Sequence, residues 1–145
     1  MNTAKTHGFT RLMKLVAVGD DAGVERFVAK YTTKTDTCNC SVTSDVVPVE
    51  ATLNAQDDRG FTALHYAARD GFSRTLKLIL GARANPDVAT PQGLTPLMCA
   101  AYGGHDECVH ALLASGASTD LADGDGVSAL FVAAERRKGR VVDLL

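Results

Sequence analysis

Hydrophobic and polar residues follow a helical period in the segment 93–118, the most regular part of the chain. Thr95 and Pro96 predict a helix start, because threonine caps free backbone N–H groups and proline lacks an N–H that would be unpaired there. The pair Gly103-Gly104 then ends the helix. Its apolar side is formed by Leu97, Ala100 and Ala101.

A second helix is predicted directly after this glycine pair. Asp106 and Glu107 mark its start, since carboxylates are favourable at a helix N-terminus, and Gly116 offers a left-handed turn at its end. Its apolar side is formed by Cys108, Val109, Leu112 and Leu113. Two short helices, each apolar on one side, cannot bury that surface alone, so neighbours of the same kind are expected.

Those neighbours follow from an internal repeat. Gly60, Gly93 and Gly126 lie 33 residues apart, and each begins a segment of the form Gly-x-Thr/Ser-x-Leu-x-x-Ala-Ala. A fixed period of this length indicates stacked supersecondary units. At these residues the sequence resembles the ankyrin-repeat family, and Thr62-Ala63-Leu64-His65 is the nearest match to its T-P-L-H signature. The resemblance covers residues 57–145 and implies an all-α solenoid of stacked helix-turn-helix units.

We expect one ankyrin-repeat domain over residues 1–145, with four repeats, an irregular first and an incomplete fourth. Gly19 precedes Gly71 by 52 residues, 19 more than the period, and this excess predicts an insertion. The insertion is rich in threonine and serine, and its role is open between solvated slack and a contact element. The expected limits are about 5–30 for repeat 1, 31–49 (Tyr31 to Val49) for the insertion, about 50–89 for repeat 2, about 90–122 for repeat 3, and 123–145 for partial repeat 4.

Some positions depart from the repeat pattern. Arg83 stands where the next repeat has Gly116, so the turn there is expected at 85–87 instead. The pair 90–91 replaces the aspartates 57–58, which predicts an altered turn. The last residues are apolar where solenoids usually close with a polar cap, so we expect that the natural protein continues past Leu145 or that the last helix packs on something else.

Composition narrows the function classes. The chain has 145 residues, a net charge of −2 and a pI near 6.0, which argues against nucleic-acid or anionic-membrane surfaces. No run is long and apolar enough for membrane insertion, and residues 1–15 lack the features of a signal peptide. The expectation is a cytoplasmic protein, with the nucleus as alternative, that is a monomer or part of a longer chain.

The histidines do not form a catalytic or metal site in the sequence pattern. His65 has no paired serine or cysteine nucleophile, and the ankyrin resemblance implies that it bonds the backbone across the turn between repeats. His105 and His110 are five residues apart, whereas the zincin pattern needs a spacing of four. We therefore expect no enzyme active site, no metal and no cofactor.

The four cysteines are expected to be free thiols. Cys38 and Cys40 form a C-x-C pair in the insertion without a second ligand pair at zinc spacing, and any redox or metal role for them stays open. Cys99 and Cys108 replace apolar residues of two helices, where buried thiols fit.

The resemblance also implies a binding surface. In ankyrin-like stacks the turn before each first helix and the end of that helix form a concave face, here with an apolar centre inside a charged rim. The expected protein-binding residues are Asp58, Arg59, Phe61, Arg69, Asp70, Gln92, Leu94, Tyr102, Asp125, Val127, Glu135 and Arg136.

The implied function is a non-catalytic protein–protein interaction module, a scaffold or adaptor that binds a partner protein through this face. Two alternatives remain open. The repeats are similar in style to the small ankyrin-type inhibitors of cyclin-dependent kinases, for example over 67–72, which would make the chain a stoichiometric kinase inhibitor. The chain would otherwise be the targeting arm of a larger multidomain enzyme.

Overall fold

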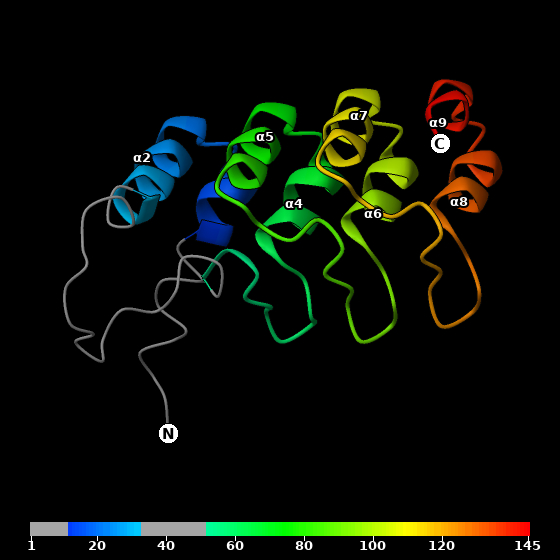
Figure 1. The fold of residues 1–145 in the computed structure, drawn as a ribbon, viewed down its shortest axis with the longest axis horizontal. Coiled ribbons are helices and arrows are strands. Elements are labelled where there is room, and N and C mark those ends of the chain that lie inside the picture. Colours follow the sequence, from blue (N-terminus) through cyan, green and yellow to red (C-terminus); the bar gives the residue numbers. More distant parts are fainter. Residues whose placement is uncertain (1–11, 33–51) are drawn as a thin grey trace.

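The computed structural model describes residues 12–32 and 52–145, which form a row of helix pairs (Figure 1). A helical segment at 12–18 precedes the first labelled helix. The labelled helices are α2 (Asp21–Thr32), α4 (Ala63–Asp70), α5 (Ser73–Gly81), α6 (Pro96–Gly103), α7 (Asp106–Ala114), α8 (Ala129–Glu135) and α9 (Gly139–Leu144).

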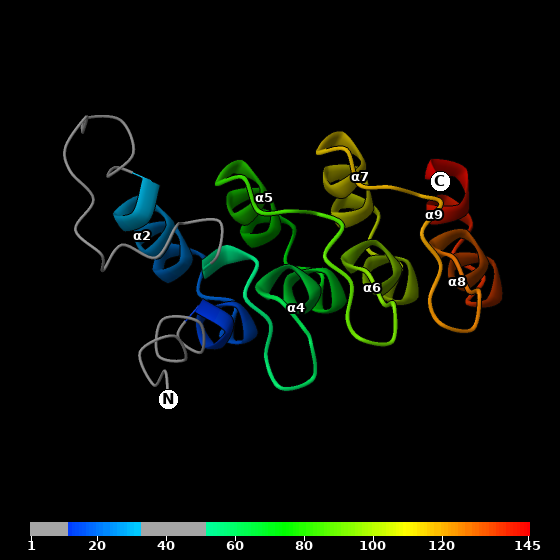
Figure 2. The ribbon, with the colours of Figure 1, turned by 60° about the horizontal axis from the view of Figure 1, so that its bottom comes forward.

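The helices lie in two layers. Helices α4, α6 and α8 pack side by side in one layer, and α2, α5, α7 and α9 form the other (Figures 1 and 2). The connections before α4, α6 and α8 extend away from the helices as three similar turns (Figure 1). Within the described ranges no helix is long and apolar enough to cross a membrane. This arrangement confirms the predicted stack of helix-turn-helix units.

The predicted helix ends are found at α6. The Thr95 hydroxyl accepts a hydrogen bond from the Met98 backbone N–H at 3.4 Å, and Pro96 occupies the first helical position. Gly104 ends the helix in the left-handed conformation, with φ at 74°. Gly116 adopts φ of 86° after α7, as expected for a glycine C-terminal turn.

Arginine takes the glycine conformation at two places. Arg83 has φ of 68° and ends α5 in the same way that Gly116 ends α7, so the prediction that 85–87 would make this turn instead is wrong. Its backbone N–H bonds to the Leu80 carbonyl at 2.9 Å, which holds the turn. Arg137, with φ of 55°, stands in the place of Gly104. Both are strained positions for a residue with a Cβ.

Helix α2 is longer than the sequence indicated. It includes residues 31 and 32, so the predicted insertion begins inside the helix rather than after it. The remainder of the insertion, 33–49, and residues 5–11 of the expected first repeat lie outside the described residues.

The core runs along the whole stack between the two layers. Small side chains in α4, α6 and α8 let these helices approach closely, and larger aliphatic side chains of the other layer fill the remaining space. The fully buried alanines include Ala67, Ala68, Ala100, Ala101 and Ala133, and the larger members include Leu76, Ile79, Val109 and Leu112. Cys99 and Cys108 are buried among them, as expected for small apolar thiols.

Polar side chains link each repeat to the next along the second layer. The Thr75 hydroxyl donates to the Asp21 carboxylate, and the Ser73 hydroxyl donates to Glu107 at 2.7 Å. An ion pair of 3.8 Å joins Arg140 to the carboxylate of the preceding repeat, Asp106. Each of these three contacts joins a repeat to its direct neighbour.

Candidate interaction surface

The three turns before α4, α6 and α8 share one backbone geometry. In each, the first residue donates its N–H to the carbonyl four residues later, at 2.9 to 3.0 Å; these pairs are Asp57–Phe61, Thr90–Leu94 and Asp123–Val127. Asp57 and Asp123 each accept two further backbone N–H groups, whereas the Thr90 hydroxyl accepts only that of Leu94. The expectation of an altered turn at 90–91 is therefore wrong for the backbone, because Thr90 donates its N–H to the Leu94 carbonyl as the aspartates do in the other turns. Only the side-chain bonding differs, since the Thr90 hydroxyl accepts one backbone N–H where each aspartate accepts two.

Direct contacts link each turn to the next one. The Gln56 amide donates to the carbonyl of Ala89 in the next repeat at 2.8 Å, and Gly124 donates to the carbonyl of Gln92 at 2.9 Å. A Cβ built on Gly93 would lie only 2.7 Å from the Cα of Asp123, so the backbones of neighbouring turns touch. The surface these turns present is thus preorganised.

His65 joins the first helix of one repeat to the turn of the next. Its Nε2 lies 3.0 Å from the Leu94 carbonyl, and its Nδ1 accepts the Thr62 backbone N–H at 3.1 Å. These partners require a neutral ring with the proton on Nε2. Burial lowers the pKa of His65 below the usual value for histidine, more strongly than the bond to Leu94 raises it. The bond across the turn implied by the family resemblance is present.

An acidic and aromatic cluster supports the first turn. The Tyr66 hydroxyl donates to the Asp57 carboxylate at 2.6 Å, and the Arg69 guanidinium lies over the Tyr66 ring at 5.1 Å. Burial raises the pKa of Asp57, but the hydrogen bonds from Tyr66 and two backbone N–H groups outweigh it, so the pKa is lowered. Burial and the bond to Asp57 both raise the pKa of Tyr66. At neutral pH Asp57 is therefore ionised and the Tyr66 hydroxyl keeps its proton.

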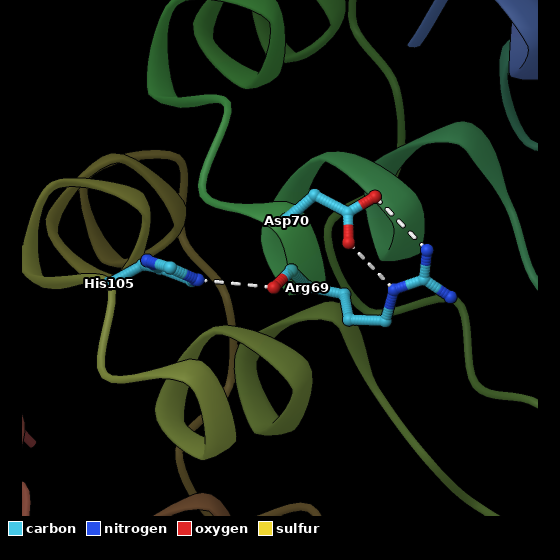
Figure 3. Close-up of polar contacts among 3 residues, drawn as sticks. All are labelled: Arg69, Asp70 and His105. Atoms are coloured by element: carbon cyan, nitrogen blue, oxygen red, sulfur yellow. Dashed lines mark hydrogen bonds and ion pairs between the residues drawn. The ribbon is translucent and has the colours of Figure 1, made fainter. Parts of the chain in front are cut away.

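The end of α4 presents a fixed ion pair to solvent. Arg69 bonds to both carboxylate oxygens of Asp70, at 2.9 and 3.0 Å (Figure 3). The His105 ring of the next repeat lies 3.1 Å from the Arg69 backbone carbonyl in the same view. The bidentate geometry orients the guanidinium, although the pair is exposed and adds little to stability.

Tyr102 and Arg136 form a second ordered pair of side chains, between the ends of α6 and α8. The Arg136 guanidinium lies 3.7 Å above the centre of the Tyr102 ring, which remains 54% exposed. A cation over the face of an aromatic ring is an attractive arrangement that restricts both side chains. The two residues come from α6 and from the residue that follows α8.

The twelve predicted binding residues divide by exposure. Phe61, Leu94 and Val127 are partly buried, and Phe61 packs edge-on against His65 at 5.4 Å, so only Tyr102 of the expected apolar centre is exposed. The exposed charged and polar members are Asp58, Arg59, Arg69, Asp70, Gln92, Asp125, Glu135 and Arg136. Their role in binding stays a prediction.

Sequence reasoning missed two features of this surface. It did not single out Tyr66, whose hydroxyl reaches back nine residues to Asp57, and no spacing rule indicates that bond. It placed Tyr102 and Arg136 on one face without pairing them. Their separation of 34, one period plus one, is a signal that they come from adjacent repeats.

Among residues 12–32 and 52–145, no three His, Cys, Asp or Glu side chains lie close enough to hold a metal ion. Burial raises the pKa of Cys99 to about 12 and that of Cys108 to about 11, so both thiols are protonated at neutral pH. Cys38 and Cys40 lie outside the described residues.

Comparison of the sequence with models of known protein families identifies the same repeats as the helix pairs of the structure. A family model described as ankyrin repeats (3 copies) matches residues 2–123 and 64–145. No curated protein matches the sequence.

Proposed function

The chain belongs to the ankyrin-repeat family, and from this premise we propose that it is a scaffold or adaptor module that recognises a partner protein through its concave face. Ankyrin repeats are generally protein–protein interaction modules and are typically non-catalytic. The face that we propose comprises the three turns, the exposed ends of α4, α6 and α8, and Arg136 directly after α8. A partner would bury roughly 800 Å² on it, an ordinary size for a specific interface.

The observation that carries this proposal is the Tyr102–Arg136 pair beside the Arg69–Asp70 pair. Tyrosine and arginine are the residue types that most often dominate binding energy at interfaces, especially when they are already ordered before binding. Both arginines here are oriented, one by a ring at 3.7 Å and one by a bidentate carboxylate. The face thus presents ordered anchors rather than flexible side chains.

A pull-down from native lysate with mass spectrometry tests the proposal. The test variant combines Tyr102→Ala with Arg136→Glu, both at exposed positions, so the fold should persist by circular dichroism. The matched control combines Lys77→Ala with His110→Ala, exposed on α5 and α7 in the other helix layer. We expect specific partners to be lost by the test variant, with an affinity drop of about tenfold or more, and retained by the control.

The other outcomes distinguish the alternatives. Partners that bind the test variant unchanged would place recognition elsewhere on the chain. Stoichiometric inhibition of a purified kinase would identify the chain as an inhibitor of the kind its repeats resemble. A cytoplasmic location, with the nucleus as alternative, belongs to the same proposal, and microscopy of a tagged chain tests it.

A further inference from the structure

Two arginines of the proposed binding face lie over tyrosine rings, but they differ in what their N–H groups bind. The Arg69 guanidinium lies 5.1 Å from the centre of the Tyr66 ring, and its N–H groups donate to both carboxylate oxygens of Asp70. The Arg136 guanidinium lies 3.7 Å from the centre of the Tyr102 ring. Among the described residues, no carboxylate lies within ion-pair distance of it. The first arrangement therefore has three members, and the second has two.

The stacked position of Arg136 leaves its hydrogen-bond donors available. A ring occupies the flat face of a guanidinium, while the N–H groups point outward in the plane and match a carboxylate in two parallel hydrogen bonds. At Arg69 these are the bonds to Asp70 that Figure 3 shows. The neighbour of Arg136 in sequence is Glu135, which forms no ion pair with it in the described part of the chain. A carboxylate from another molecule can therefore take the place at Arg136 that Asp70 has at Arg69.

The Tyr102–Arg136 pair lies between two repeats that the structure describes, and its arginine is turned toward the earlier one. Tyr102 belongs to the last turn of α6, and Arg136 directly follows α8. The residue after Tyr102 is Gly103, which stands one period after Asp70 and brings no carboxylate to this place. Both members of the pair remain exposed, so a ligand can reach them. The cation and the ring also restrict each other, so less side-chain freedom is lost on binding.

The charge of the turns limits where an acidic ligand can approach. Residues 54–61, 85–94 and 118–127 contain six aspartates and one arginine, a net charge of −5, so the turns repel carboxylates. Arg136 follows Ser128, the N-cap of α8, by eight residues, which correspond to about 12 Å of helix rise. This separation exceeds the Debye length of about 8 Å at physiological ionic strength. A carboxylate at Arg136 is therefore largely screened from the aspartates of the turns, whereas further carboxylates placed near the turns are disfavoured.

We infer that the Tyr102–Arg136 pair binds one aspartate or glutamate side chain of the partner protein, through two hydrogen bonds from the guanidinium. The inference rests on the proposed function, because it specifies the chemistry of the partner at the same face. The remainder of the bound segment is uncharged or basic, since the turns carry a net charge of −5. The partner is thus recognised by a single carboxylate and not by an acidic tract.

A double-mutant cycle between the full chain and a peptide tests this inference. Short random peptides are selected from a displayed library on the wild-type chain, and those that Tyr102→Ala no longer binds are kept. These should share one Asp or Glu, which is replaced by Asn or Gln in a second synthetic version. In fluorescence anisotropy the amide should weaken binding to the wild type about tenfold and leave binding to Arg136→Gln unchanged. The matched control, Arg74→Gln, is exposed on α5 in the other helix layer and should show the same tenfold loss as the wild type.

The other outcomes separate this inference from the proposed function. If the amide weakens binding equally in the wild type and in Arg136→Gln, the inference is wrong, while the dependence of the same peptides on Tyr102 still supports the binding face. If a phosphoserine version binds more tightly than the carboxylate version and loses this advantage in Arg136→Gln, the inference is overturned in favour of a phosphorylated partner. If no selected peptide depends on Tyr102, both the inference and the proposed binding face are wrong.

Discussion

Two glycines with the same backbone conformation differ in what surrounds them, and this difference predicts two different costs for one substitution. Gly93 has φ of 88° and Gly116 has φ of 86°. A Cβ on Gly93 would meet the Cα of Asp123 at 2.7 Å and the backbone nitrogen of Gly124 at 3.1 Å. A Cβ on Gly116 would meet nothing within 4 Å. Gly116→Ala therefore measures backbone strain alone, and Gly93→Ala measures strain and collision together.

The magnitudes follow from these surroundings. A residue with a Cβ in the left-handed region costs about 1–2 kcal/mol, and alanine recovers about 0.4–1 kcal/mol by restricting the unfolded chain. Gly116→Ala should lower the free energy of unfolding by about 1 kcal/mol. Gly93→Ala also pushes two turn backbones apart, which disrupts the bond from Gly124 to Gln92 and adds overpacking. Its total cost should be about 3 kcal/mol.

Urea unfolding followed by far-UV circular dichroism measures both variants against the wild-type chain, with the m value checked for constancy. The second readout is partner binding, which only Gly93→Ala should affect, because its turn belongs to the face that we propose as the binding surface. Equal losses of stability in the two variants would show that neighbouring turns are not in firm contact, and would refute the argument that the surface is preorganised.

Three further predictions follow from single side chains. Arg83→Gly should raise the thermal midpoint and the free energy of unfolding, the latter by about 0.5–1 kcal/mol. Glycine removes the backbone strain at φ of 68°, and this gain exceeds the loss from the greater conformational entropy of the unfolded chain. A lower midpoint would contradict this prediction. Folding lowers the pKa of His65, so the stability contributed by its neutral ring is complete above the unfolded pKa of about 6.5 and is lost as the pH falls below that value. The urea midpoint should therefore change more between about pH 7 and about pH 5 in the wild type than in His65→Met. Equal changes in the two proteins would exclude this role of His65. Cys99 and Cys108, with pKa values of about 12 and about 11, should stay unlabelled by a thiol reagent in the native chain and react after unfolding, as located by peptide mass spectrometry; rapid native labelling would show that the core opens.

The fold was predictable because its signals are local and repeated. Gly60, Gly93 and Gly126 mark three turns at one period, and Thr95 with Pro96 marks a helix start that the structure has at the same residues. Each signal reflects a backbone requirement that few residue types meet. Repetition then identifies the stack, since one helix pair alone cannot bury its apolar side.

The errors arose where a residue adopts a conformation that its type does not favour. Arginine has no preference for the left-handed region, so Arg83 could not be identified as a turn residue from its type. A second error arose at the turn that begins at Thr90. There the threonine hydroxyl accepts one backbone hydrogen bond, which replaces part of the bonding that an aspartate carboxylate provides in the other two turns. At the surface, the exposure of Phe131 and the partial burial of Phe61 depend on neighbours in space, which the spacing of residues does not show.

The polar links between successive repeats have a consequence for how the chain tolerates changes in length. The bond from Ser73 to Glu107 spans 34 residues, whereas the bond from Thr75 to Asp21 spans 54, because extra residues separate the first two repeats. The entropy of closing a loop grows only with the logarithm of its length, so this difference costs about 0.4 kcal/mol. In terms of loop-closure entropy, the connection between these two repeats can therefore grow or shrink at little cost to the stability of the stack, since even a doubling of its length costs about 0.6 kcal/mol.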